Sequence, residues 1–290
     1  AQDGDSEDEP TGAGDREWRF RNGALAVLAY EDFLTAAIGG VVTTASVELA
    51  RFVAEAAPQD HWRGLRCVEL GSGCGLVSGT LAKLGAEVIA TDLEPFLGHL
   101  EWNVGLNAPA ATAETAPAPR CEALDWGDAT SRERIREMLG DGGADAIFAA
   151  NCVYDCAAVP PFLTAVAAVA GPSTATFMCG IPVPLAATKE AGTAAVVATG
   201  ETILDAFLAA APAAFDCYLL RPSAPVAVGE ARVVDEEVSG VAAQLAARHG
   251  LSLRFLADGI WLLLPRGTMP PEWVRPLLWP GLGPSSQEAA

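Results

Sequence analysis

The chain has 290 residues, which is long enough for one large α/β domain or for two small ones. Apolar residues make up 51% of it, so a substantial core is available, although alanine inflates that share. The formal net charge of −19 argues against an exposed nucleic-acid backbone as the main partner. This charge would suit a basic protein or peptide, and it also serves solubility.

Cysteine and histidine usage bears on redox state and metal binding. The seven cysteines form no Cys-x-x-Cys pair and the three histidines are scattered, so we expect free thiols in a reducing compartment and no metal centre. No apolar run reaches the roughly 18 residues that a membrane helix needs, and the N-terminus lacks a basic-then-apolar leader. We therefore expect no membrane association and a cytoplasmic location, with a nuclear one also open.

The two ends of the chain differ in composition from its middle. Residues 1–16 are acidic and Gly-rich, which predicts a disordered N-terminus, and residues 269–290 form a C-terminal tail. Residues 17–60 are interpreted as an N-terminal segment that packs on the binding site of the main domain. This segment contains an apolar helix that Pro58 ends.

Residues 61–268 are interpreted as the main domain, in which strands and helices alternate. In chain order we expect strand 66–70, helix 76–84, strand 87–91, a helix from 95, strand 120–124, helix 130–140, strand 144–150, a helix from 160 and strand 174–179. The run 144–150 is apolar apart from Asp145, which is typical of a buried parallel strand. Asn103 and Asn107 are interpreted as caps at the end of the second helix.

Residues 183–235 interrupt this alternation and are predicted to be an insertion or lid, because they are long for a connection. A helix at 202–210 and a strand at 216–220 lie within them. Helix 236–248 follows, and then strands 252–256 and 259–264 with a turn at Asp258-Gly259. This order predicts an α/β fold with a doubly wound, mostly parallel sheet and an antiparallel C-terminal edge hairpin.

The most informative motif lies between Cys67 and Asp92. Glu69 precedes the loop Gly71-Ser72-Gly73-Cys74-Gly75, and Asp92 comes 21 residues after Gly71. Glycines let the backbone turn sharply and approach a ligand closely, and the later carboxylate can accept hydrogen bonds from both hydroxyls of a ribose. The pattern therefore predicts a site for an adenosine-bearing cofactor.

The glycine spacing favours S-adenosylmethionine over NAD. A dinucleotide fold needs Gly-x-Gly-x-x-Gly, whereas the third glycine here, Gly75, comes one position early. The carboxylate of Glu69 would repel a pyrophosphate, but it suits the amino group of a methionine moiety.

Further polar residues follow the ends of two later strands. Asp125 and Trp126 come after strand 120–124, where a carboxylate can accept from an adenine amino group and an indole can cover the adenine face. Asn151 and Tyr154 follow strand 144–150, at the carboxyl edge where ligands bind in open α/β sheets. We therefore expect these four side chains beside the cofactor.

Together these residues resemble the seven-β-strand protein methyltransferases related to the lysine methyltransferase 21 group. The resemblance covers roughly residues 37–182 and rests on Gly39-Gly40-Val41-Val42, the stretch 68–76, Leu84-Gly85-Ala86, Thr91-Asp92-Leu93, Asn103 with Asn107, Asp125-Trp126-Gly127 and Val153-Tyr154. It implies a seven-stranded Rossmann-like methyltransferase sheet. It also implies methyl transfer to a side-chain nitrogen, usually of lysine, on a folded protein. The implied binding residues for S-adenosylmethionine are Gly71, Ser72, Gly73, Asp92, Trp126 and Ala150.

The chain departs from this family at two positions. The family usually has Trp where Thr43 stands, so one wall of the adenine pocket is altered. It also has an acid where Asn151 stands, whereas Tyr154 is kept. Methyl transfer is an in-line displacement that needs a neutral, well-positioned amine. A carboxylate would ease deprotonation of that amine, while Asn151 offers only a carbonyl acceptor and an amide donor.

Three outcomes follow from Asn151: a lysine substrate with a neutral acceptor, a different nitrogen substrate, or a weakened enzyme. We interpret the chain as an S-adenosylmethionine-dependent protein N-methyltransferase with Asn151 and Tyr154 as its catalytic residues. The alternatives are a methyltransferase for a small molecule or another nitrogen, and a catalytically silent binding module on the same fold.

Overall fold

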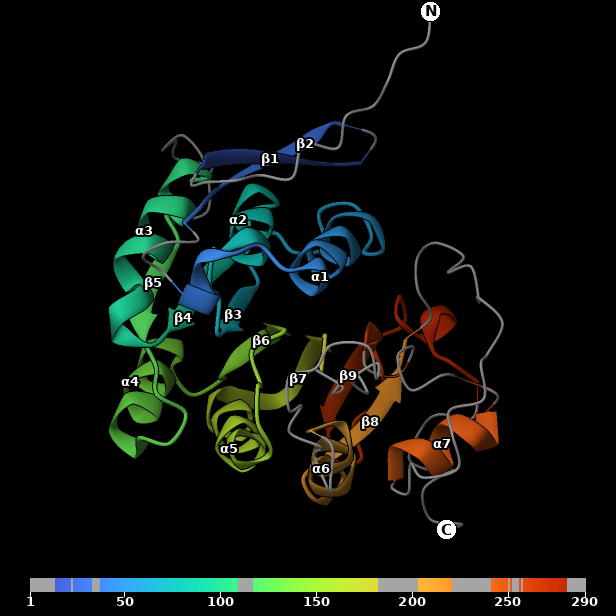
Figure 1. Cartoon of the computed structure of the whole chain (residues 1–290). Coiled ribbons are helices and arrows are strands. Elements are labelled where there is room, and N and C mark those ends of the chain that lie inside the picture. Colours follow the sequence, from blue (N-terminus) through green and yellow to red (C-terminus); the bar gives the residue numbers. More distant parts are fainter. Residues whose placement is uncertain are drawn as a thin grey trace, which may run out of the picture.

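The computed structural model describes residues 14–21, 23–32, 37–108, 117–181, 203–220, 241–249, 251, 256 and 258–280. Its centre is a seven-stranded sheet in the order β5-β4-β3-β6-β7-β9-β8 (Figure 1). The strands are β3 (Arg66–Leu70), β4 (Glu87–Asp92), β5 (Arg120–Ala123), β6 (Ala144–Ala150), β7 (Ala170–Cys179), β8 (Phe215–Leu219) and β9 (Ile260–Pro265). Strands β3 to β7 are parallel, and β9 is antiparallel to both β7 and β8. The predicted doubly wound, mostly parallel sheet is confirmed.

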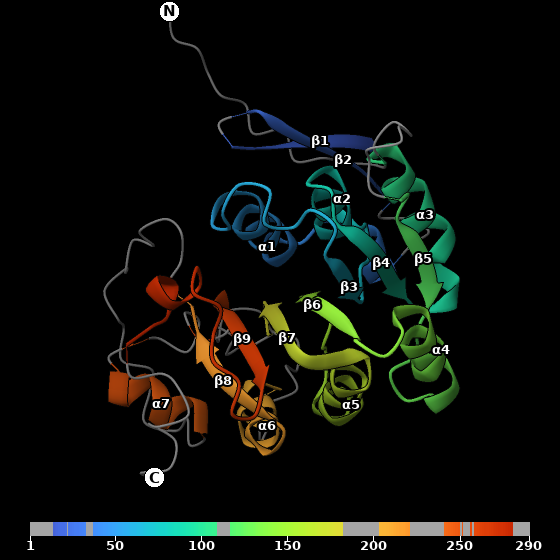
Figure 2. The same ribbon diagram turned by 180° about the vertical axis from the view of Figure 1, so that it is seen from behind.

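Helices cover both faces of this sheet (Figures 1 and 2). One face carries α1 (Thr44–Glu55), α2 (Leu76–Lys83) and α3 (Leu97–Leu106), and the other carries α4 (Ala129–Leu139), α5 (Val159–Val169), α6 (Ile203–Ala210) and α7 (Val241–His249). Short 3-10 turns lie at Ala37–Gly40, Glu94–Phe96, Cys156–Ala158, Ala211–Ala213 and Arg275–Leu277. Among the described residues, no helix is long and apolar enough to cross a membrane.

Alternation along the strands divides the core into two layers. Val68 and Ile147 pack with the α4–α7 layer, whereas Cys67 and Phe148, their neighbours in the chain, pack with α1 and α2. Successive side chains of a strand point to opposite faces, so an apolar strand such as β6 serves both layers. The chain leaves β3 toward β4 on one side and later returns to β6 on the other. This reversal opens a crevice at the carboxyl ends of β3 and β6.

The antiparallel edge differs from the predicted hairpin. The partner of β9 is β8, and residues 252–255 of the expected strand lie outside the described residues. Leu256 is helical and fully buried, and its carbonyl accepts a hydrogen bond of 2.8 Å from Trp261 Nε1. Leu256 itself therefore lies outside a strand.

The predicted insertion at 183–235 is wrong for residues 203–220. Strand β8 completes the edge of the sheet, and Leu204 and Phe207 of α6 are buried in the core beneath it. These residues therefore belong to the main domain. The remainder of the predicted insertion lies outside the described residues.

An N-terminal hairpin, β1 (Gly14–Phe20) with β2 (Leu25–Glu31), was not expected from the sequence. It includes residues 14–16 of the predicted disordered N-terminus, and residues 1–13 lie outside the description. Asn107 is the C-cap of α3, as predicted, and it also holds this hairpin together with Asn103, which lies within the helix. The side-chain amide of Asn107 bonds Leu28 N and O at 2.8 and 2.6 Å, and that of Asn103 bonds Tyr30 N and O at 2.7 and 3.0 Å.

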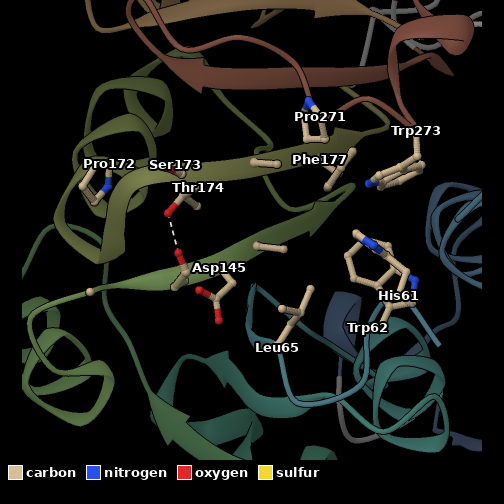
Figure 3. A pocket seen from close by; sticks show the side chains of 14 residues that line it. His61, Trp62, Leu65, Asp145, Pro172, Ser173, Thr174, Phe177, Pro271 and Trp273 are labelled. Atoms are coloured by element: carbon tan, nitrogen blue, oxygen red, sulfur yellow. Dashed lines mark hydrogen bonds between the residues drawn. The ribbon is translucent and has the colours of Figure 1, made fainter. Parts of the chain in front are cut away.

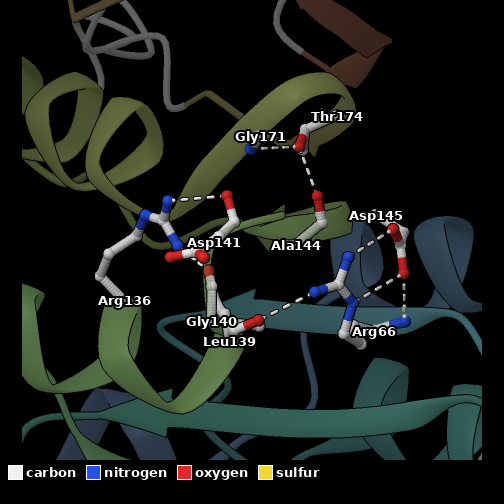
Figure 4. Close-up of polar contacts among 9 residues, drawn as sticks. All are labelled: Arg66, Arg136, Leu139, Gly140, Asp141, Ala144, Asp145, Gly171 and Thr174. Carbon is white, nitrogen blue, oxygen red and sulfur yellow. Dashed lines mark hydrogen bonds and ion pairs between the residues drawn. The ribbon is translucent and has the colours of Figure 1, made fainter.

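A polar network joins the amino ends of the central strands (Figure 4). Asp145 of β6 accepts from the backbone N–H and the guanidinium of Arg66 on β3, and Arg66 also donates to the carbonyl of Leu139 at 2.8 Å. The hydrogen bonds to Asp145 hold the pKa of this carboxyl below its usual value against the opposing effect of burial. This network ties β3, β6 and the end of α4 together at the edge opposite the crevice.

Candidate functional site

A cavity of about 520 Å³ lies at the carboxyl ends of β3, β4, β5 and β6. Nine of the ten predicted site residues line it: Gly71, Ser72, Gly73, Asp92, Asp125, Trp126, Ala150, Asn151 and Tyr154. Glu69 does not line it. The topology therefore brings together residues from four strand ends that are far apart in sequence.

The glycine loop forms the floor of the cavity in a backbone conformation that side chains rarely adopt. Gly71, Gly73 and Gly75 have φ angles of 67°, 51° and 69°. A Cβ atom at Gly71 would lie 2.6 Å from Cys152 Cβ, and one at Gly73 would lie 3.2 Å from the carbonyl oxygen of Gly39. Both positions lack room for a side chain, so the loop presents bare backbone to the cavity.

Asp92 is oriented by the loop that it faces. Its Oδ2 accepts from Gly73 N and its Oδ1 accepts from Leu93 N, each at 2.8 Å. Burial raises the pKa of Asp92, and these two amide hydrogen bonds oppose that shift. The carboxylate lines the cavity with lone pairs left over for a ligand.

Glu69 lies beneath the loop and anchors α2. It is 1% exposed, and its Oε2 accepts from Ser78 N at 2.9 Å and from Ser78 Oγ at 2.5 Å. Burial raises its pKa to about 7, and the hydrogen bonds from Ser78 oppose the shift. Its contact is with the helix that follows the loop, and its predicted contact with the cofactor stays a prediction.

The raised pKa of Glu69 predicts a pH-dependent stability. A carboxyl group that titrates near 4.5 when unfolded and near 7 when folded favours folding fully below pH 4.5, and this contribution is lost as pH rises through 7. We expect the free energy of unfolding to fall, on the order of 3 kcal/mol, relative to Glu69→Gln over that range. Urea unfolding of both proteins at pH 5 and pH 7.5 measures this difference, and parallel pH profiles would contradict it.

Ser72, Asp125 and Trp126 also line the cavity, and Asp125 is exposed. Ser72 Oγ accepts from Thr91 N at 3.1 Å, which joins the loop to β4. Asp125 Oδ1 accepts from Gly127 N at 2.8 Å, and this turn directs Trp126 toward the cavity. The indole packs edge-on against Phe162 at 5.2 Å between ring centroids. Trp126 thus supplies a flat apolar wall, as predicted for a residue beside a base.

Asn151 and Tyr154 lie at the mouth of the cavity. Asn151 has a φ of 48°, a left-handed conformation that Asn tolerates better than most residues, and its N–H donates to the carbonyl of Cys179 at 2.8 Å. Tyr154 is 48% exposed, and burial of its hydroxyl end raises its pKa to about 12, so the phenol stays protonated at neutral pH. The two residues therefore offer an amide and a neutral hydroxyl at the entrance.

The N-terminal segment supplies the opposite wall, through Gly39, Val41, Thr43 and Ser46. This stretch belongs to the segment 17–60, whose packing on a cofactor site stays a prediction. Thr43, which stands where the resembling family has Trp, is also the N-cap of α1, because its Oγ1 accepts from Ser46 N at 3.2 Å. The wall at this position is therefore small and polar.

Other lining residues were missed by sequence reasoning, among them Cys74, Leu93, Phe96 and Cys152. Cys74, Leu93 and Cys152 adjoin predicted residues along the chain, so adjacency was the available signal for them, whereas Phe96 lies four residues after Asp92. Cys67, Cys74, Cys121, Cys152, Cys179 and Cys217 are free thiols, as expected. Within the described ranges, no group of three or more His, Cys, Asp or Glu could hold a metal.

The charge of the cavity wall has one sign. Asp92 and Asp125 are the charged side chains among the described lining residues, and no Lys, Arg or His joins them. Two carboxylates in a largely apolar cavity favour a ligand that carries positive charge.

A second cavity, of about 360 Å³, lies at the amino ends of β6 and β7 (Figure 3). Trp62, Phe177 and Trp273 line one side, and Asp145 and Ser173 line the other. None of the predicted site residues reaches this cavity. Of these two cavities, only the larger one is lined by predicted site residues.

Comparisons with known proteins agree with this arrangement. A family described as lysine methyltransferase matches residues 24–182. The protein-lysine methyltransferase METTL21E of Mus musculus is 34% identical over 116 residues, which cover 40% of this chain and 45% of the relative. The protein N-lysine methyltransferase METTL21A of Danio rerio is 36% identical over 124 residues, covering 43% and 52%.

The matched part of the chain thus spans about half the length of these relatives. Among solved structures, the T. thermophilus 16S rRNA methyltransferase RsmC in complex with AdoMet and guanosine aligns with a TM-score of 0.41 and 20% identity, over 60% of this chain and 43% of that one. The family match covers more than half of the chain, including the glycine loop, Asp92 and the segment 151–154. The chain belongs to the lysine methyltransferase family.

Proposed function

We propose that this protein transfers the methyl group of S-adenosylmethionine to the side-chain amine of a lysine in a protein partner. The observation that carries the proposal is the larger cavity, which combines a bare glycine floor with a wall whose charged groups are Asp92 and Asp125. S-adenosylmethionine bears a sulfonium, and lysine arrives as an ammonium. Both positive groups fit a cavity that carries carboxylates and no cation among its described lining residues.

Different residues of the cavity would bind different parts of the cofactor. We assign the ribose hydroxyls to Asp92, because its two oxygens face the cavity beside the glycine loop. The indole of Trp126 would cover the adenine, and Asp125 would accept from its amino group. Gly71 and Gly73 would let the methionine part approach the backbone. When bound, S-adenosylmethionine supplies an electrophilic methyl group.

We assign the acceptor amine to the mouth of the cavity. Asn151 can accept a hydrogen bond from the amine through its carbonyl oxygen, and the neutral phenol of Tyr154 can accept a second. Two fixed acceptors align the nitrogen, and such positioning is a main contribution that an enzyme makes to a displacement. Neither group is a strong base, so we infer that the proton of the ammonium leaves to solvent before the methyl group is transferred.

Substitution of Asn151 discriminates between acceptor classes. With a lysine substrate, Asn151→Asp should raise the methylation rate near neutral pH, because a carboxylate holds the ammonium and helps to shed its proton. Aspartate tolerates the left-handed conformation at this position, so the fold should persist. Tyr154→Phe should lower the rate while it leaves cofactor affinity unchanged. Initial rates of the three proteins on one identified substrate measure both effects.

The same Asn-x-x-Tyr segment also favours a second candidate, methylation of an amide or ring nitrogen. Such a nitrogen carries no ammonium charge and gains from the donor that Asn151 offers. In that case Asn151→Asp should lower the rate. If the methylation rate changes in neither Asn151→Asp nor Tyr154→Phe, both assignments are contradicted, and the role of the Asn-x-x-Tyr segment is structural.

The class of substrate can be tested with labelled cofactor and a cell lysate. A labelled protein band supports the proposal, and label in the small-molecule fraction supports a metabolite methyltransferase. Cofactor binding without transfer to either fraction would contradict both and support a silent binding module. We place the partner among proteins rather than nucleic acids because of the negative net charge. The free thiols suit the reducing cytoplasm or nucleus.

A further inference from the structure

Glu31, the last residue of β2, is a buried carboxylate outside the cavity. It is 1% exposed. Its Oε1 accepts from the backbone N–H of Val42 at 2.8 Å, and its Oε2 accepts from the guanidinium of Arg16 at 2.9 Å. A buried carboxylate is costly unless such donors satisfy it. One of its two donors belongs to the backbone of the segment that forms a wall of the cofactor cavity.

That wall, residues 39–43, is held at several points. Besides the bond from Val42 N to Glu31, the carbonyl of Gly40 accepts from Asp32 N at 2.9 Å. The carbonyl of Gly39 packs so closely on Gly73 that an added Cβ there would lie 3.2 Å away. The end of β2 therefore sets how near this wall lies to the glycine loop.

Strand β2 is itself fixed to the helix that follows Asp92. Asn103 and Asn107 on α3 are 0% and 2% exposed, and each bonds both the N–H and the C=O of one β2 residue. A side-chain amide paired with backbone in this way acts as one more rung of a β-ladder. The wall is thus connected through β2 and α3 to the strand that carries the ribose-binding carboxylate.

We propose that Glu31 is a positioning residue for the cofactor: by accepting from Val42 N it holds the wall 39–43 against the glycine loop. Glu31 does not line the cavity, so it acts through the backbone of Val42. The proposal rests on the proposed function, because it takes S-adenosylmethionine as the ligand of the cavity. The proposal assigns the effect to the acceptor for Val42 N, which is Oε1, because Arg16 is half-exposed and bonds the other oxygen, Oε2.

Three substitutions separate the acceptor from the charge. Glu31→Ala removes both, Glu31→Gln keeps an acceptor for Val42 N, and Arg16→Ala removes only the ion pair. Titration calorimetry with S-adenosylmethionine should show about a tenfold rise in Kd for Glu31→Ala, the scale of one buried hydrogen bond. Glu31→Gln and Arg16→Ala should stay within about threefold of wild type. In steady-state assays, Glu31→Ala should raise the KM for cofactor and leave kcat at saturating cofactor unchanged.

Equal affinities for S-adenosylmethionine in folded Glu31→Ala and wild type would overturn the proposal. A loss of affinity in Glu31→Gln equal to that in Glu31→Ala would also overturn it.

Amide hydrogen exchange provides a second readout that needs no transfer activity. The Val42 N–H should exchange faster in Glu31→Ala than in Glu31→Gln, and S-adenosylmethionine should slow its exchange in wild type. If Glu31→Ala does not fold, wild type and Glu31→Gln still test the proposal. S-adenosylmethionine should slow exchange of the Val42 N–H in both proteins, and unchanged exchange in both would overturn the proposal. If wild type binds no S-adenosylmethionine, the proposed function fails, while the exchange rates of the free variants still test the link from Glu31 to Val42.

Discussion

Gly73→Arg should abolish binding of S-adenosylmethionine. Gly73 lies in the floor of the cavity with a φ of 51°, and a Cβ there would lie 3.2 Å from the carbonyl of Gly39. An arginine side chain has no room on the side of the wall, so it must occupy the space that the ligand needs, and its charge opposes that of the sulfonium. Titration calorimetry should detect no heat of binding at cofactor concentrations that saturate wild type.

Gly98→Arg is the matched control for this substitution. Gly98 is an exposed position of α3, and nothing lies within 4 Å of a Cβ added there. It adds the same charge and bulk to the same protein, so its affinity for the cofactor should equal that of wild type. Undiminished binding by folded Gly73→Arg would remove the glycine loop from the cofactor site.

Asp92→Ala should weaken cofactor binding by about 1.5–3 kcal/mol, the scale for hydrogen bonds to a charged group. The carboxylate ends β4 beside the glycine loop, where the hydroxyls of a ribose can donate to it. Because it also accepts from the amides of Gly73 and Leu93, its loss should loosen the loop as well. The dissociation constant measured by calorimetry should therefore rise by a factor of about 10 to 150.

Two further variants separate the ligand contact from other effects at Asp92. Asp92→Asn keeps one acceptor oxygen, so it should fall between wild type and Asp92→Ala. Glu94→Ala removes an exposed carboxylate two residues away that does not line the cavity, and it should bind like wild type. An Asp92→Ala protein with wild-type affinity would contradict the assignment of the ribose.

The elements that the sequence predicted well are those whose signal is local. The run of β6, apolar apart from Asp145, has the predicted bounds, because a strand buried on both faces can be recognised from its own composition. Helix α4 begins one residue before the predicted helix 130–140. Asp128 caps it, because its side chain accepts from Thr130 N and Ser131 N.

The features that were missed depend on partners distant in the chain. The predicted strand 216–220 is present as β8, but its pairing with β9 spans about 40 intervening residues, and the unpredicted β2 is held by the side chains of Asn103 and Asn107, 73 and 79 residues away. No short window of sequence contains either partner. Leu256 lies in an apolar stretch of sequence that favours a strand, and its carbonyl accepts a hydrogen bond from Trp261 Nε1 in the structure.

The candidate site was largely predictable because parallel strands end at one edge of the sheet. Asp92, Asp125 and Asn151 each follow a strand, and topology brings such positions together. Glu69 shows the limit of that reasoning. It shares a face of β3 with Cys67, which packs toward α2, so strand alternation directs its carboxylate to Ser78 and away from the cavity.

The most direct test of the account is to locate the transferred methyl group. The purified protein would be incubated with S-adenosylmethionine that carries a deuterated methyl group and with a cell lysate, and labelled peptides would be sequenced by mass spectrometry. The account predicts label on lysine side chains, absent in Gly73→Arg and present in Gly98→Arg. Label confined to an amide or ring nitrogen, to a small molecule, or to no product despite cofactor binding would contradict it.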